Sequence, residues 1–140
     1  MTYFRWTNEL DVMVDDMNDQ HKILISIMND LFELNGRRAG KYKILRKLNE
    51  LVSYTRKHFR DEEAYMESIK FTGRKNHKII HERLLKQLNA YAEDFKVNNE
   101  GLTEKFFYFL KNWLATHIEH TDNKYGVASW EHSPFPAAGM

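Results

Sequence analysis

Two pairs of candidate metal ligands recur with the spacing of one helical turn. His58 and Glu62 are four residues apart, and so are His77 and His81. On a helix, residues i and i+4 lie on the same face, so each pair aims two side chains at one point. Imidazole together with carboxylate suits zinc, iron, copper or manganese, and iron is a natural candidate for such a mixed site. The two pairs therefore predict a metal centre.

Three further residues extend this set: His21 and His117 lie on apolar helical stripes, and Asp122 follows His117. A single histidine on an apolar face is more often a hydrogen-bonded core residue than a ligand. Burying this many polar groups unpaired, however, would cost on the order of several kcal/mol, and a shared metal site satisfies them together. His120, near a helix end, and His132, in the tail, fall outside the set.

The number of candidate ligands exceeds what one ion needs. Two carboxylates can bridge two ions, and the five imidazoles then divide three and two. With one bridging oxygen added, the first ion has three imidazoles and three bridging ligands. The second ion has one ligand fewer, which leaves a position open for a small molecule.

Helices must position these side chains. Stretches with helical periodicity and without glycine or proline separate the few glycines, and residues 1–17 show no clean period. Residues 1–17 are expected to form an extended N-terminal arm, Asn18 or Asp19 to cap the first helix, and the chain after residue 122 to be an irregular tail. Four helices are predicted, over about residues 18–36, 41–69, 73–98 and 102–120.

Short connections make sequential helices antiparallel, so the predicted fold class is all-α, an up-down-up-down four-helix bundle. In this order the ligands late in the second and fourth helices lie level with those early in the first and third. The ligands are therefore expected at one end of the bundle. His117 and Asp122 are five residues apart, an offset of about 140° on a regular helix, which predicts a π-bulge or a helix end between them.

Composition narrows the class of protein. The chain has 140 residues, 42% of them hydrophobic, so we expect a single domain over residues 1–140. The formal net charge of +1 argues against a nucleic-acid-binding surface, and the absence of cysteine excludes disulfides and thiolate metal sites. No apolar run approaches the roughly 20 residues of a membrane helix, and the N-terminus lacks a signal-peptide core. A soluble cytoplasmic protein without membrane insertion is expected.

The ligand pattern resembles that of the hemerythrin family. The matching features are His21, His58-x-x-x-Glu62, His77-x-x-x-His81 and His117-x-x-x-x-Asp122. The opening segment, with Trp6, Leu10-Asp11-Val12 and Gln20-His21-Lys22, is similar to that of bacteriohemerythrins. The resemblance extends from about residue 6 to residue 125.

This resemblance implies a non-haem di-iron centre that binds O₂ reversibly. It implies that His77, His81 and His117 hold one iron ion and that His21 and His58 hold the ion with the open position. Glu62 and Asp122 would bridge the two ions together with an oxo or hydroxo group. The implied role is an oxygen carrier, store or delivery protein rather than an enzyme, with an unidentified protein partner receiving O₂.

Two other functions stay open. One is a sensor of O₂, NO or redox state that acts through a separate partner, and the other is a di-iron oxidase or peroxidase. Four residues are candidates for walls of the O₂ pocket, although ordinary core packing would explain them equally well. They are Leu24, Phe59, Trp113 and Leu114.

Overall fold

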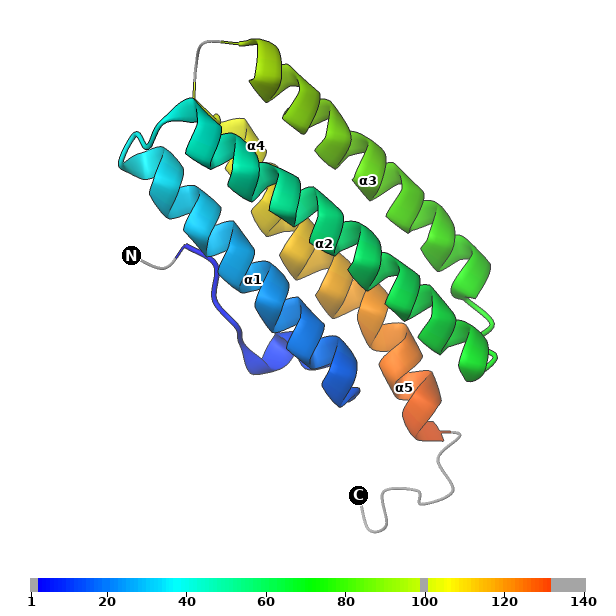
Figure 1. Cartoon of the computed structure of the whole chain (residues 1–140). Helices are drawn as coiled ribbons and strands as arrows, with labels where there is room; N and C mark the ends of the chain where they lie inside the picture. Colours follow the sequence, from blue (N-terminus) through cyan, green and yellow to red (C-terminus); the bar gives the residue numbers. More distant parts are fainter. Residues whose placement is uncertain (1–2, 99–100, 132–140) are drawn as a thin grey trace.

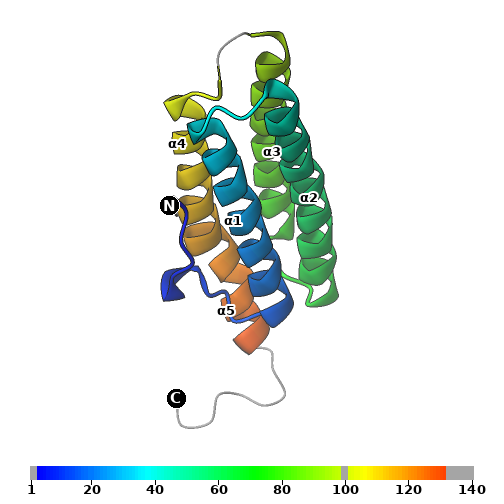
Figure 2. The same ribbon diagram turned by 60° about the vertical axis from the view of Figure 1, so that its left-hand side comes forward.

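Figure 1 shows a computed structural model of the chain, which describes residues 3–98 and 101–131. Within these ranges all secondary-structure elements are helices, and the long helices form an antiparallel bundle (Figures 1 and 2). The predicted all-α four-helix bundle is therefore confirmed. None of the described helices is long and apolar enough to cross a membrane. A single domain over residues 1–140 stays a prediction, and His132 lies outside the described residues.

The first three helices are long because glycine and proline are absent from their interiors. The fourth helical rod consists of the short helix α4, a π-helical segment η2 and a final helix α5, which follow one another without a break (Figure 1). The bounds are α1 Asp15–Gly36, α2 Lys41–Ser68, α3 Arg74–Val97, α4 Glu104–Asn112, η2 Trp113–Asp122 and α5 Asn123–Glu131.

The first helix begins earlier than expected. Helix α1 starts at Asp15, with no side-chain cap, and its first turn carries Asp15 and Asp16, whose charges complement the helix dipole. Asn18 holds the N-terminal arm instead of capping the helix. Its Oδ1 accepts a hydrogen bond from Val12 N at 3.0 Å, and its Nδ2 donates to Asp11 Oδ1 at 2.8 Å.

The expectation of an irregular tail directly after residue 122 is wrong. Helix α5 continues to Glu131 and packs beside the arm, and Gly126 permits this approach. A Cβ atom at Gly126 would lie 1.9 Å from the carbonyl oxygen of Val12. Gly126 therefore lets two backbones approach each other closely, and it does not end the helix.

The arm itself crosses the bundle as expected, apart from a short 3-10 helix, η1 Asn8–Leu10. It is fixed by Asn29 of α1, whose side-chain oxygen accepts hydrogen bonds from the backbone N–H groups of Tyr3 and Phe4. Phe4 is 1% exposed, so the arm contributes to the core.

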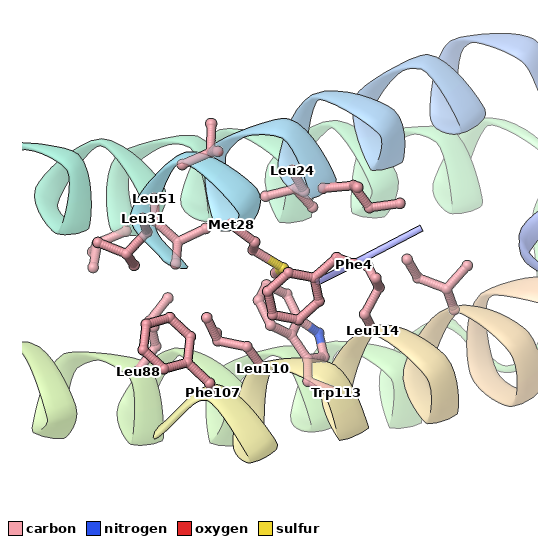
Figure 3. Close-up of a cluster of buried hydrophobic side chains, with 14 of the residues drawn as sticks. Phe4, Leu24, Met28, Leu31, Leu51, Leu88, Phe107, Leu110, Trp113 and Leu114 are labelled. Carbon is pink, nitrogen blue, oxygen red and sulfur yellow. The ribbon is translucent and has the colours of Figure 1, made fainter. Parts of the chain in front are cut away.

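A core of buried apolar side chains fills the middle of the bundle. Figure 3 shows side chains from α1, α2 and α3 pointing toward those of the fourth rod, with Phe4 of the arm between them. This packing fixes the helices against one another, so the polar side chains at the end of the bundle are held in defined positions. The labelled members are Phe4, Leu24, Met28, Leu31, Leu51, Leu88, Phe107, Leu110, Trp113 and Leu114.

Candidate metal centre

The seven predicted ligands meet at the end of the bundle where α1 begins and α2 ends (Figure 1). Each of the four rods contributes to the cluster, and all seven side chains are buried, with at most 4% exposed. The sequence-based expectation that they share one end of the bundle is confirmed. The members are His21 of α1, His58 and Glu62 of α2, His77 and His81 of α3, and His117 and Asp122 of η2.

The donor atoms fall into two groups that share both carboxylates. Glu62 and Asp122 occur in each group. The three-histidine group adds His77, His81 and His117, and the two-histidine group adds His21 and His58. The division into three and two imidazoles is therefore a property of the folded chain.

Glu62 presents one oxygen to each group. Its Oε1 lies 2.9 Å from His81 Nε2 and 3.5 Å from His77 Nε2, both in the three-histidine group. Its Oε2 lies 3.2 Å from His21 Nε2 and 3.1 Å from His58 Nε2, in the two-histidine group.

Asp122 divides its oxygens in the same way. Oδ1 lies 2.7 Å from His77 Nε2 and 2.9 Å from His117 Nε2, and Oδ2 lies 3.1 Å from His21 Nε2. Both carboxylates therefore have one oxygen toward each group of imidazoles.

Many of these donor atoms are close to one another without forming hydrogen bonds. Within the described part of the chain, the Nε2 atoms of His77, His81 and His117 have no hydrogen-bond partner, and neither oxygen of Asp122 has one. Orphaned buried polar atoms cost free energy, and convergent lone pairs are the arrangement that a metal ion satisfies. The mixed imidazole and carboxylate donors suit iron, so the residues present fit the group that the pattern implies.

In the metal-free cluster, the histidines and carboxylates shift one another's pKa values. Burial alone would lower the pKa of His21, but its contacts with Asp122 and Glu62 outweigh burial and raise the pKa to about 9. The same balance raises the pKa of His77 to about 9. Burial would raise the pKa of Glu62, but the nearby His58 and the hydrogen bond from His21 lower it well below its usual value. In the metal-free cluster, protonated imidazoles and ionised carboxylates therefore balance one another's charge.

The π-helical segment η2 Trp113–Asp122 explains how His117 and Asp122 both face the cluster. The wider turn of a π-helix brings residues five apart onto one face, which a regular α-helix does not. The predicted π-distortion between these two residues is confirmed. Nothing is described of the side chain of His120, which lies in the same segment.

Tyr125 belongs to this site, although sequence reasoning missed it. Its hydroxyl donates a hydrogen bond of 2.9 Å to Glu62 Oε2, and its side chain is fully buried. The available signal was its position three residues after Asp122, which places both on one helical face. The expected irregular tail concealed that relation.

The candidate pocket residues are all buried, but they do not all lie on one side of the cluster. Leu24 and Leu114 face the core from α1 and η2, with Trp113 beside them (Figure 3). Phe59 instead lies against the three-histidine group, because its ring stacks on His81 with a centroid distance of 3.7 Å. Its centroid is 5.9 Å from that of His58. The role of Leu24, Phe59, Trp113 and Leu114 as walls of an O₂ pocket stays a prediction.

Comparison with known proteins gives consistent results. The model of the hemerythrin HHE cation binding domain matches residues 12–127. A bacteriohemerythrin from Clostridium acetobutylicum is 28% identical over 126 residues, which cover 87% of this chain and 98% of that protein. A hemerythrin from Sipunculus nudus is 28% identical, covering 87% of this chain and 90% of the relative.

Solved structures agree with these sequence relatives. The crystal structure of wild-type hemerythrin superimposes with a TM-score of 0.83 at 25% sequence identity. The match covers 90% of this chain and 97% of the crystallised one. The likeness thus includes all four helical rods that carry the seven candidate ligands.

Proposed function

The chain belongs to the hemerythrin family, and from this premise we propose that its buried cluster holds two iron ions and binds O₂ reversibly. The observation that carries the proposal is the division of the carboxylate oxygens, one toward each group of imidazoles. When bound, iron supplies reversible redox chemistry and an open coordination position. The protein supplies the ligands and their orientation, and it keeps water away.

The proposed roles follow the two groups of donors. His77, His81 and His117 hold the ion that has the larger set of protein ligands. His21 and His58 hold the other, on which the open position lies. Three imidazoles against two are what make the two positions unequal.

Glu62 and Asp122 would hold both ions, because each carboxylate has one oxygen toward each group of imidazoles. Tyr125 fixes the orientation of Glu62 through its hydrogen bond to Oε2, the oxygen that faces the two-histidine group.

Apolar side chains exclude water from the centre in this proposal. Leu24 and Leu114 are 1% and 5% exposed, and Trp113 is buried beside them. Phe59 covers the face of His81 by stacking on it. In this proposal these buried apolar side chains limit the access of water and protons to the centre.

An oxygen carrier, store or delivery protein fits the donor set better than an oxidase. As metal ligands, five neutral imidazoles with two carboxylates would leave the centre less anionic than the carboxylate-rich sites of di-iron oxidases. A lower negative charge gives less stabilisation to highly oxidised iron. A partner that receives O₂ from this chain belongs to the same proposal.

One experiment tests the proposed function. The protein is loaded with ferrous iron without oxygen, its iron is counted per chain, and its absorption spectrum is recorded before and after O₂ is added and then removed. We expect two iron ions per chain and a spectral change that reverses when O₂ is removed. One ion per chain, or an irreversible change at the first exposure, would contradict the proposal.

A further inference from the structure

A chain of hydrogen bonds leads from the two-histidine group to the protein surface. His58 Nδ1 lies 2.6 Å from Gln20 Oε1, and Gln20 Nε2 donates to Asp61 Oδ2 at 2.9 Å. Lys57 Nζ donates to the same oxygen of Asp61 at 2.9 Å. Gln20, Asp61 and Lys57 line a groove of about 670 Å³ between α1 and α2.

Asp61 determines which way the amide of Gln20 points. Asp61 Oδ2 accepts a hydrogen bond from the ammonium group of Lys57, which can only donate. An ionised carboxylate can only accept hydrogen bonds, so the NH₂ group of Gln20 must face Asp61. The carbonyl oxygen of Gln20 therefore faces His58.

The orientation of Gln20 in turn selects the tautomer of His58. A carbonyl oxygen only accepts, so the proton of the contact must be on His58 Nδ1. A neutral imidazole carries one N–H, which leaves the lone pair on Nε2. Nε2 is the atom that lies 3.1 Å from Glu62 Oε2 in the cluster.

We infer that Gln20, held by Asp61 and Lys57, is a positioning residue that fixes the Nδ1–H tautomer of His58 and keeps its Nε2 free to bind a metal ion. Without an acceptor at Nδ1, the strongest acceptor near His58 is Glu62, and the proton moves to Nε2. That proton blocks the atom that must bind the ion. The surface pair of Asp61 and Lys57 thus acts on a buried ligand through one amide.

The three-histidine group has its own acceptor. Glu63 Oε2 lies 2.9 Å from His81 Nδ1, and a carboxylate needs no partner to fix its acceptor role. The two metal positions therefore have separate orienting residues, Gln20 for one and Glu63 for the other. Outer partners of this kind typically change metal affinity by about 10-fold to 100-fold when they are removed.

The inference rests on the proposed function, because it assigns His58 to a metal position, so the first test uses the metal-free protein. Long-range ¹H–¹⁵N spectra recorded over a series of alkaline pH values show which nitrogen of His58 carries the proton. We expect Nδ1–H in the parent and in Gln20→Glu, which keeps an acceptor, but Nε2–H in Gln20→Met. An unchanged Nδ1–H signal in Gln20→Met would overturn the inference.

The second test is a titration of the metal-free chain with Co²⁺, which reports each position by its own binding phase. We expect Gln20→Met to weaken one phase by about 10-fold to 100-fold and to leave the other unchanged. The matched control, Glu63→Met, should weaken the other phase instead. Equal weakening of both phases by Gln20→Met would indicate a general structural effect and contradict the inference.

Two further measurements separate a failure of this inference from a failure of the proposed function. Asp61→Asn changes only a partly exposed side chain, so it leaves the core intact, and it frees the amide of Gln20 to turn. We expect it to reproduce the effect of Gln20→Met in weaker form, and a parental spectrum and titration would count against the inference. A parent chain that binds a single Co²⁺ would instead refute the two-ion centre, whereas the tautomer spectrum would still decide the role of Gln20.

Discussion

Replacing Tyr125 by phenylalanine removes one buried hydrogen bond and little else. The hydroxyl donates to Glu62 Oε2 at 2.9 Å, and both side chains have no exposed surface. Burial, followed by the nearby charge of Glu62, raises the pKa of Tyr125 well above its usual value, so the hydroxyl remains a donor at alkaline pH.

The size of the effect follows from the charge of the acceptor. Hydrogen bonds to charged groups contribute about 1.5–3 kcal/mol, more than the roughly 1 kcal/mol of a neutral pair. Phenylalanine fills nearly the same volume, so no cavity is added. We expect Tyr125→Phe to lower the free energy of unfolding of the metal-free protein by about 1.5–3 kcal/mol. At about 2–4 °C per kcal/mol, this lowers Tm by roughly 3–12 °C.

Urea unfolding of the metal-free protein at neutral pH measures this difference. The matched control is Tyr108→Phe, because Tyr108 is 70% exposed and its hydroxyl is solvated. Surface changes of this kind stay within about 0.5 kcal/mol. If Tyr125→Phe costs no more than Tyr108→Phe, then Glu62 is not a buried anion held by Tyr125, and the reasoning about the cluster's charge fails.

Four other outcomes are expected. Removing iron should lower the melting temperature, because metal that binds only the folded bundle stabilises it by mass action, and equal midpoints with and without iron would argue against an interior site. The metal-free protein should become easier to unfold with urea as the pH rises from about 6.5 to 9. The reason is that the raised pKa values of His21 and His77 favour folding only while these residues are protonated. A urea midpoint that stays constant or rises over this pH window would contradict the raised pKa values. Leu114→Asn should leave the iron content nearly intact. Because the variant admits water, the oxygenated spectrum should decay several-fold faster in stopped-flow measurements. An unchanged decay rate would make Leu114 an ordinary core residue. Gly126→Ala should cost about 1–3 kcal/mol in thermal or urea unfolding through overpacking, whereas Gly36→Ala, which meets nothing within 4 Å, should not; similar costs would rule out the contact with the arm.

The periodicity of the sequence was enough to predict the bundle and the ligand set. Spacings of four residues place His58 with Glu62 and His77 with His81, because helix geometry alone puts i and i+4 on one face. The order of antiparallel helices then brought the ligands to one end. The five-residue spacing from His117 to Asp122 was also informative, since only a distorted helix can satisfy it.

Element boundaries required the tertiary structure. Asn18 has the side chain of a helix cap, but its hydrogen bonds go to the arm, so α1 begins at Asp15. Gly126 has the sequence signature of a helix end, but it lies inside α5 against Val12. In both cases a contact with the N-terminal arm outweighs a local preference.

The chemistry around the ligands was decided in the same way. The sequence contains Glu62, but the direction of each of its oxygens depends on which imidazoles the packed helices bring to each side. Tyr125 becomes a partner of Glu62 only because α5 continues the fourth rod, and Phe59 faces His81 instead of its neighbour His58. Spacing along one helix fixes which residues share a face, whereas the atoms that meet between helices are set by the packing of the core.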